Sequence, residues 1–246
     1  MKNLLSNLNP SSAALVRSIG VLARDQGVAA YLVGGPVRDL MLGRPNADLD
    51  ITVEGNGLRL AEGFAALHRG AKLTRYPAFK TASVHLTDGT LVDFASSRKE
   101  TYKRGGAFPE VKASTIKDDL LRRDFTFNAM ALAINPDTWG KLIDPYGGQA
   151  DLRGKKICVL HEKSFLDDPT RILRAARFKA RLGFKIEVQT LKLIKSAVKI
   201  KVLDTIKPQR YLKDFNKVLK EAEFKEAIRI LRSWDAYSDQ MGGHIK

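Results

Sequence analysis

Two aspartates, Asp48 and Asp50, stand one residue apart in a short apolar stretch of the sequence. The alternation over residues 49–53 predicts a strand, and side chains at i and i+2 of a strand point to the same face. Two neighbouring carboxylates raise each other's proton affinity unless a cation joins them. Mg²⁺ prefers oxygen ligands and shares carboxylates with substrate phosphates. Asp48 and Asp50 are therefore candidate metal ligands, although a lone pair of this kind is also common as solvated or capping carboxylates.

A glycine pair precedes these aspartates in the motif G-G-P-V-R-D, which begins at Gly34. A buried strand is predicted to run into Gly34 and Gly35, and a short helix to follow them. Exposed backbone amides at the start of a helix suit the negative charge of a triphosphate. Twelve residues separate Gly35 from Asp48. Each motif alone is weak, but the combination is far more specific.

This arrangement resembles the signature of the polymerase-β-like nucleotidyltransferase superfamily. The resemblance implies a third carboxylate on a neighbouring strand. Asp93, in the stretch L-V-D-F, is the candidate, and an ordinary edge-strand residue is the alternative.

An arginine-rich motif follows in the stretch R-R-D-F-T-F-N-A, which begins at Arg122. The planar guanidinium groups of Arg122 and Arg123 suit phosphate. Asp124 and Asn128 lie four residues apart, so a helix here would place them on one face, where an acid and an amide can bond the hydroxyls of a ribose. A surface helix with internal ion pairs is the alternative.

The order G-G-x-V-R-D, D-x-D and R-R-D-F-T-x-N-A resembles the class II tRNA nucleotidyltransferases and the related bacterial poly(A) polymerases. Two further motifs match in the same order: D-P-Y-G-G-Q-A-D-L from Asp144 and D-P-T-R-I-L-R-A-A-R-F from Asp168. The resemblance covers roughly residues 30–185. It implies template-independent addition of C and/or A to the 3′ end of tRNA from CTP and ATP, with two Mg²⁺ ions. A poly(A) polymerase and a catalytically idle RNA-binding paralogue are the alternatives.

The same resemblance implies the roles of individual residues. Asp48, Asp50 and Asp93 become catalytic, with Asp48 and Asp50 as metal ligands. The implied nucleotide-binding residues are Gly34, Gly35, Arg38, Arg123, Asp124, Asn128, Asp168, Arg171, Arg174 and Arg177.

Base selection falls to Asp168 and Arg171 in this assignment. Three residues apart at a predicted helix start, they are expected to project to one side, where an acceptor and a donor can meet the edge of cytosine or adenine. The chain has Asp167 where the family has glutamate, which leaves the bracing of Arg171 open. A carboxylate that only stabilises the helix dipole is the alternative.

The formal net charge of +15 favours a polyanionic partner, and the resemblance makes that partner tRNA, contacted at its 3′ end and acceptor stem. A basic stripe is expected along the helix that carries Arg171. Lysines further on are expected to add phosphate contacts, and a solvated face is the alternative reading. The residues concerned are Arg171, Arg174, Arg177 and Arg181, then Lys192, Lys195, Lys199, Lys201, Lys207 and Lys213.

These residues require an α/β head with a mixed sheet and flanking helices over 1–143, followed by an all-helical neck and body over 144–246. Strands are predicted at 29–33, 49–53, 81–86 and 91–95, and helices at 15–24, 37–42, 57–68 and 114–121. Helices are also predicted at 168–182, 187–200, 208–221 and 224–234. A mobile loop is expected at 101–109, beside the site, and frayed structure from about 236.

No run of about 18 apolar residues exists, so no membrane span is expected. The polar N-terminus lacks the pattern of a secretory signal, and a cytoplasmic location follows as the default. One cysteine and four scattered histidines exclude a multi-cysteine zinc site. The short helical portion after about residue 220 leaves three readings open: a compact variant, a CC-only or A-only adder that works with a partner enzyme, or a shortened chain.

Overall fold

The structure is a computed structural model that describes residues 3–44, 48–101 and 110–236. The chain forms two compact units. The head unit comprises Met1–Glu100, Val111–Arg123 and Phe127–Gln149, and the helical unit comprises Thr101–Glu110, Asp124–Thr126 and Ala150–Lys246. The predicted domain boundary after residue 143 lies within the last segment of the head unit and stays a prediction. Within the described ranges, no helix is long and apolar enough to cross a membrane.

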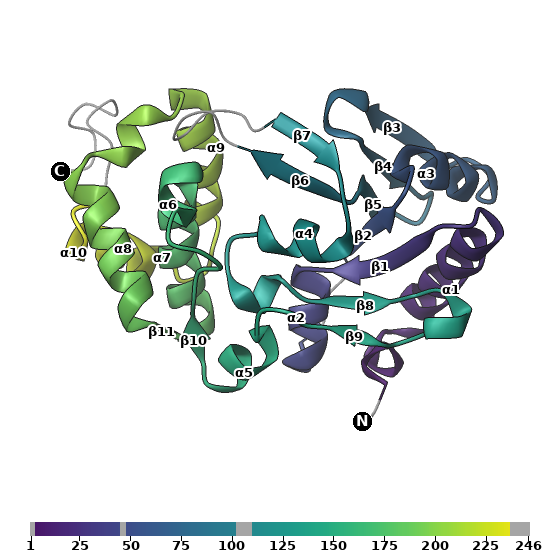
Figure 1. Cartoon of the computed structure of the whole chain (residues 1–246), viewed down its shortest axis with the longest axis horizontal. Helices are drawn as coiled ribbons and strands as arrows, with labels where there is room; N and C mark the ends of the chain where they lie inside the picture. The colour runs from purple at the N-terminus through teal and green to yellow at the C-terminus, as the bar shows by residue number, and fades with distance from the viewer. Residues whose placement is uncertain (1–2, 45–47, 102–109, 237–246) are drawn as a thin grey trace. The chain divides into compact units, whose positions relative to one another are not determined.

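A seven-stranded mixed sheet forms the centre of the head unit (Figure 1), in the order β3-β4-β5-β2-β1-β8-β9. Neighbours pair antiparallel except β2 and β5, which are parallel. The strands are β1 (Ala29–Val33), β2 (Leu49–Glu54), β3 (Lys72–Tyr76), β4 (Thr81–His85), β5 (Leu91–Ser96), β8 (Ala131–Ala133) and β9 (Leu142–Ile143).

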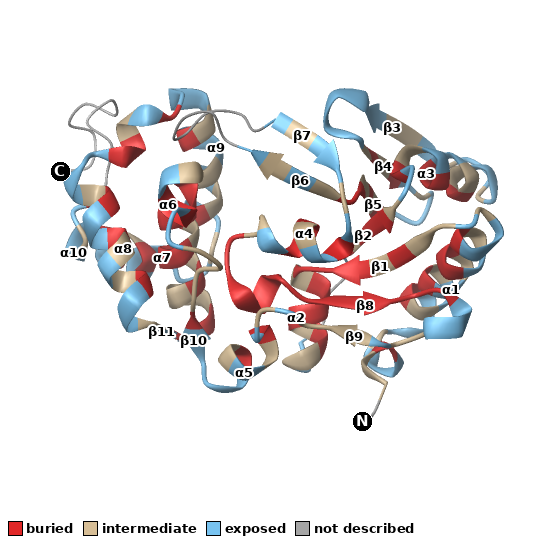
Figure 2. Ribbon diagram, viewed as in Figure 1, coloured by how far each residue is buried: buried red, intermediate tan, exposed pale blue. Residues whose placement is uncertain are grey.

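Burial within this sheet falls from its middle to its edge. Figure 2 shows β1 and β8 largely buried and β3 largely exposed. Four α-helices accompany the sheet: α1 (Pro10–Asp25), α2 (Gly35–Met41), α3 (Gly57–Ala66) and α4 (Ile116–Leu121). Helices α1 and α3 pack on the sheet and on each other, and Val16, Ile19, Leu60 and Phe64 are fully buried there. Strands β1, β2 and β5, which carry or flank the candidate carboxylates, therefore lie in the middle of the sheet, away from its edges.

Shorter elements complete the head unit. The 3-10 turns are η1 (Leu4–Asn7), η2 (Pro77–Phe79), η3 (Thr126–Asn128), which begins in the helical unit, and η4 (Pro136–Thr138). A separate two-stranded sheet consists of β6 (Arg98–Thr101) and β7 (Glu110–Ala113). The loop expected at 101–109 lies almost wholly outside the described residues.

The helical unit contains α6 (Ser164–Asp167), α7 (Thr170–Leu182), α8 (Val188–Lys199), η5 (Val202–Thr205), α9 (Pro208–Leu219) and α10 (Phe224–Ser233). Helix α5 (Gly148–Arg153) joins the two units in sequence. Helices α9 and α10 pack against α7 and against each other, and Phe178, Tyr211 and Ile230 are buried in that core. The parallel pair β10 (Lys156–Ile157) and β11 (Lys185–Ile186) is a small exception to the predicted all-helical composition.

The segments with periodic apolar residues form the helices and strands predicted for them. Strand β1 has its predicted bounds, and the helices of the second half differ by one or two residues at their ends. Helix α4 begins after Thr115, whose hydroxyl accepts from the Asp118 amide and so caps the start of the helix. The helix expected to carry both Asp124 and Asn128 is wrong, because Asp124 lies in a bend and Asn128 ends the 3-10 turn η3.

Candidate active site

Asp50 and Asp93 are brought together by the parallel pairing of β2 and β5, in which they are direct register partners. The Ser83 hydroxyl on β4 donates to Asp93 Oδ1 at 2.5 Å, since Ser83 is the register partner of Asp93 on its other side. Both carboxylates line a cavity of about 340 Å³, here named the carboxylate cavity. Its lining residues are Val33, Asp50, Ile51, Thr52, Tyr76, Thr81, Ala82, Ser83, Asp93, Phe94, Ala95, Arg122 and Arg123.

The pKa of Asp50 is raised to about 6. Burial is the largest cause, because it disfavours the charged form. The positive charge of Arg123 acts in the opposite direction, and the negative charges of Asp93 and Asp48 add to the increase. Asp50 is therefore a half-buried acid that a cation at this position would hold in its ionised form.

Asp48 is placed differently from its prediction. It is exposed and precedes the first residue of β2, so the two aspartates do not share one strand. Asp48 lines a separate cavity of about 460 Å³ with Asn9, Ser11 and Asp88, among others. Its charge nevertheless acts on Asp50. Asp93 is therefore the direct neighbour of Asp50 within the carboxylate cavity, whereas Asp48 lines a different cavity.

Asp50 and Asp93 are the carboxylates of the carboxylate cavity that could bind a divalent cation. Among the residues that the structure describes, no group of three or more His, Cys, Asp or Glu side chains is arranged to hold a metal ion. Two carboxylates are nonetheless enough for Mg²⁺, which commonly takes one or two together with waters and substrate phosphates. Asp50 and Asp93, paired across neighbouring strands with mutual repulsion, fit that requirement.

Arg122 and Arg123 also line the carboxylate cavity, and a buried carboxylate holds both. Asp119 is 0% exposed; its Oδ1 accepts from Arg122 Nε at 3.0 Å and Nη2 at 2.8 Å, and its Oδ2 accepts from Arg123 Nη2 at 3.1 Å. Glu100 accepts from Arg122 Nη1 at 3.2 Å and from Arg98 Nη2 at 2.9 Å. The two cavity arginines are therefore fixed in place by acids behind them.

Burial by itself would raise the pKa of Asp119, but the charges and hydrogen bonds of Arg122 and Arg123 outweigh it and lower that pKa. Asp119 stays ionised at neutral pH, and the two guanidinium groups keep their partner.

The glycine turn lies against one of these arginines. Gly34 has φ +72°, and a Cβ there would stand 2.7 Å from Arg123 Nη1, so only glycine permits this approach. Helix α2 begins at Gly35, two residues before the predicted start of this helix at residue 37. Arg38 is buried, and its Nη1 donates to Asn128 Oδ1 at 2.7 Å while its Nε and Nη2 donate to Asp39. The structure thus joins Gly34 to Arg123 and Arg38 to Asn128.

Asp124 and Asn128 do not share a face, contrary to the prediction. Asp124 belongs to the helical unit, where its Oδ2 accepts from both Nε and Nη2 of Arg174. The Nε distance is 2.7 Å. Asn128 belongs to the head unit and contacts Arg38 there. A bend at Asp124, in place of a helix, is the reason for the separation.

Asp168 and Arg171 occupy adjoining but different elements of the helical unit. Asp168 follows α6 with extended backbone, and its Oδ1 accepts from Thr170 Oγ1 at 2.7 Å and pairs with Arg210 Nη2 at 2.9 Å. Arg171 lies in α7, is buried, and donates to Ser164 Oγ at 2.7 Å. The expectation that both residues lie in one helix is therefore wrong, and each has its own partners. Their projection to one side stays a prediction.

The predicted arginine stripe of α7 is not a bare solvated face. Arg174 pairs with Asp124, while Arg177 and Arg181 approach Glu221 at 3.6 and 3.5 Å. Arg174, Arg177 and Arg181 also lie over the ring of Phe178, at 5.1 to 5.8 Å from its centre. Phe178 and the acids organise this stripe, which sequence spacing alone did not indicate.

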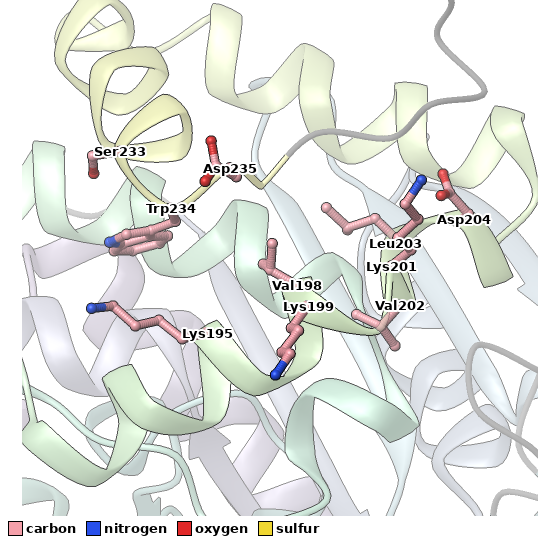
Figure 3. A pocket seen from close by; sticks show the side chains of 10 residues that line it. All are labelled: Lys195, Val198, Lys199, Lys201, Val202, Leu203, Asp204, Ser233, Trp234 and Asp235. Carbon is pink, nitrogen blue, oxygen red and sulfur yellow. The ribbon is translucent and has the colours of Figure 1, made fainter.

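Three of the lysines expected to contact phosphate line a cavity of about 580 Å³ in the helical unit. Figure 3 shows Lys195, Lys199 and Lys201 around it, with Trp234 above Lys195. Lys192, Lys207 and Lys213 are not among its lining residues. Phosphate binding by these lysines stays a prediction.

Sequence reasoning missed several residues that shape these sites: Ser83, Glu100, Asp119 and Arg210. Asp119 had a readable signal, since it stands three and four residues before Arg122 and Arg123, the spacing of ion pairs on a helix. Ser83, Glu100 and Arg210 reach their partners through strand pairing or helix packing, which spacing does not show.

A mixed sheet that pairs two carboxylates on neighbouring parallel strands, next to a glycine turn, defines a nucleotidyltransferase-type head, followed here by a predominantly helical part. Residues 30–158 match the family described as the poly A polymerase head domain. The chain therefore belongs to that family, and the predicted resemblance to the class II tRNA nucleotidyltransferases and the predicted fold class are confirmed.

Relatives and solved structures agree with this placement. The chain is 44% identical over 215 residues to an A-adding tRNA nucleotidyltransferase of Aquifex aeolicus, an alignment that covers 87% of this chain and 26% of the relative. A solved apo form of a CCA-adding enzyme has a TM-score of 0.89 at 43% identity, covering 96% of this chain and 55% of that one. The Thermotoga maritima CCA-adding enzyme complexed with tRNA has a TM-score of 0.84 at 41% identity, covering 96% and 53%. The chain thus spans about a quarter to about half of the proteins it matches.

Proposed function

We propose that this chain is a template-independent tRNA nucleotidyltransferase that adds C and/or A to the 3′ end of tRNA from CTP and ATP. The register pairing of Asp50 with Asp93, in a cavity that also holds Arg122 and Arg123, is the observation that carries the proposal. The relatives are named for this activity, and that of Aquifex aeolicus for A addition, which favours A as a nucleotide added here. The cytoplasm is the location we propose for it.

Asp50 and Asp93 would hold Mg²⁺, with Asp48 as a further ligand. Two bound ions would activate the attacking 3′-hydroxyl and stabilise the leaving pyrophosphate. Arg123, fixed by Asp119 and lying against Gly34, would bind the triphosphate, together with the amides of the glycine turn. Arg38, Asp39 and Asn128 form the bonded support behind that turn.

The helical unit would select the base. We propose that Asp168 accepts a hydrogen bond from the base and that Arg171 donates one to it. Asp168 Oδ1 also contacts Thr170 and Arg210. A well-placed pair of this kind is worth about 1–3 kcal/mol of discrimination between bases. Arg174 and Arg177, with Asp124, would support that helix face and contact the nucleotide or the RNA backbone.

Product sequencing tests the proposal. Three tRNA transcripts, ending before CCA, after the first C and after CC, are incubated with CTP, ATP or both, beside an unstructured RNA. We expect addition that stops at the natural end of tRNA. Long adenosine tracts on unstructured RNA indicate a poly(A) polymerase, and no addition in any reaction contradicts both readings.

Asp50→Asn is the matched variant for this test. Because a metal contributes several kcal/mol and each 1.4 kcal/mol is tenfold in rate, we expect kcat to fall by at least about 1,000-fold. Asp118→Asn, at a half-buried carboxylate of α4 that does not line the carboxylate cavity, is the control and should retain the activity.

A further inference from the structure

Tyr76 is an aromatic side chain that the fold does not use in its core. It ends the edge strand β3, is 47% exposed and lines the carboxylate cavity. Its register partner across the β3–β4 hairpin is Thr81, another lining residue. Half of a large ring therefore faces solvent at the cavity that holds Asp50 and Asp93.

The backbone that follows Tyr76 is held firmly. Arg98 Nη1 donates to the Phe79 carbonyl at 2.6 Å, and the Ser96 amide donates to the Lys80 carbonyl at 3.0 Å. Arg98 is itself paired with Glu100 at 2.9 Å. These hydrogen bonds fix the turn after Tyr76 to β5 and β6. They therefore also hold the end of β3 that carries Tyr76 in position.

An aromatic ring and guanidinium groups in one cavity are the combination with which proteins bind single-stranded nucleic acid, the ring stacking on a base and the cations meeting phosphates. The carboxylate cavity contains this combination in Tyr76, Arg122 and Arg123. We propose that the Tyr76 ring stacks on a nucleobase, and that this base is the 3′-terminal base of the RNA being extended.

The choice of the RNA end rests on the proposed function. In that function the base of the incoming nucleotide is bound by Asp168 and Arg171 of the helical unit. The attacking 3′-hydroxyl must reach Asp50 and Asp93, and the terminal base is only one ribose away from that hydroxyl. The terminal base is thus the one that the carboxylate cavity has to accommodate.

The experiment uses a tRNA transcript with 2-aminopurine at its 3′ end, whose fluorescence falls when the base stacks. Wild type, Tyr76→Ala, Tyr76→Phe and Phe79→Ala are compared by this quenching and by steady-state KM values. Phe79 is the matched control, because it is 50% exposed on the same turn and is not a lining residue. Because Tyr76 is half-exposed, Tyr76→Ala should fold, which a thermal melt checks.

We expect Tyr76→Ala to lose the quenching and to raise the KM for RNA by about 5- to 150-fold, the range that loss of one base–aromatic stack produces. The KM for the nucleotide should stay unchanged, and Tyr76→Phe and Phe79→Ala should behave as wild type. Unchanged quenching in Tyr76→Ala overturns the proposal. So does a rise in the KM for the nucleotide alone, or an equal loss in Phe79→Ala. Wild type that quenches but extends no RNA contradicts the proposed function and leaves the stacking intact.

Discussion

At the scale of single residues, Asp50 in the carboxylate cavity destabilises the folded chain at neutral pH. Asp50 is half-buried beside Asp93, and burial together with the neighbouring negative charges raises its pKa to about 6. The folded chain therefore binds a proton more tightly than the unfolded chain between about pH 4 and pH 6. Stability from this residue is lost as the pH rises through that window, by about 3 kcal/mol in order of magnitude at pH 7.

Asp50→Asn should consequently be more stable than wild type at pH 7.5 and equal to it near pH 4. Urea unfolding at both pH values, in the presence of a chelator, measures the difference. A variant that is less stable at pH 7.5 contradicts the assigned pKa and the repulsion from Asp93.

Asp119 has the opposite effect on stability, because Arg122 and Arg123 keep it ionised in the folded chain. Removing one partner of a buried ion pair commonly costs about 3–5 kcal/mol, so Asp119→Asn should lower the free energy of unfolding by roughly 3 kcal/mol at pH 7. The loss should shrink in acid, as the wild-type carboxylate becomes protonated. Asp119→Asn should also raise the KM for the nucleotide, because Arg123 loses the carboxylate that holds it in place.

Asp118→Asn is the control for this prediction, because Asp118 adjoins Asp119 on α4 but is only half-buried. Its hydrogen bonds are to Ser114 and Thr115, away from the arginines. Equal effects of the two substitutions on the KM would contradict a specific role for Asp119.

At the scale of elements, the turn between β1 and α2 combines a conformational requirement with a steric one. Gly34 has φ +72°, and its Cα approaches Arg123 so closely that a methyl group would meet Nη1 at 2.7 Å. Gly43, which follows α2, has φ +64°, and no atom of the described residues lies within 4 Å of a Cβ placed there. A substitution at Gly43 therefore tests backbone strain alone, whereas a substitution at Gly34 tests backbone strain together with displacement of Arg123.

Gly34→Ala should cost about 1–3 kcal/mol and raise the KM for the nucleotide, because Arg123 must move. Gly43→Ala should cost about 1 kcal/mol and leave that KM unchanged. Thermal melts and steady-state kinetics on both variants measure this. A Gly34→Ala enzyme with wild-type KM means that Arg123 does not bind the triphosphate.

At the scale of the whole molecule, a net charge of +15 makes electrostatic attraction a general property of the chain, and the structure shows where some of it is concentrated. Lys195 and Lys199 line the cavity beside Trp234, whereas Lys192 on the same helix does not. Each phosphate contact changes the slope of log affinity against log salt by about 0.7–0.9.

The double variant Lys195→Gln/Lys199→Gln should weaken tRNA binding and reduce that slope by roughly one to two. Filter binding from 50 to 300 mM salt is the measurement, with Lys192→Gln as control. An unchanged slope excludes this cavity from the RNA-binding surface.

Much of the head could be predicted because its signals are local. Strand β1, strand β2 and helix α3 are periodic segments bounded by glycine or asparagine, so their sequence determines their conformation directly. The short strands β8 and β9 and the exposed strand β3 have no such pattern, and sheet pairing decides them. For the same reason, the sequence named Asp93 as a candidate but could not show that it lies opposite Asp50.

The residue types and their order determined the family, the head fold and the set of acids and arginines that the site draws on. Only the tertiary structure decided their partners. It joined Arg38 to Asn128, Arg174 to Asp124 and Asp168 to Arg210. The two members of each pair are far apart in the sequence. The packing of whole elements therefore determines the pairs, because it decides which charged side chains are buried together and must neutralise one another.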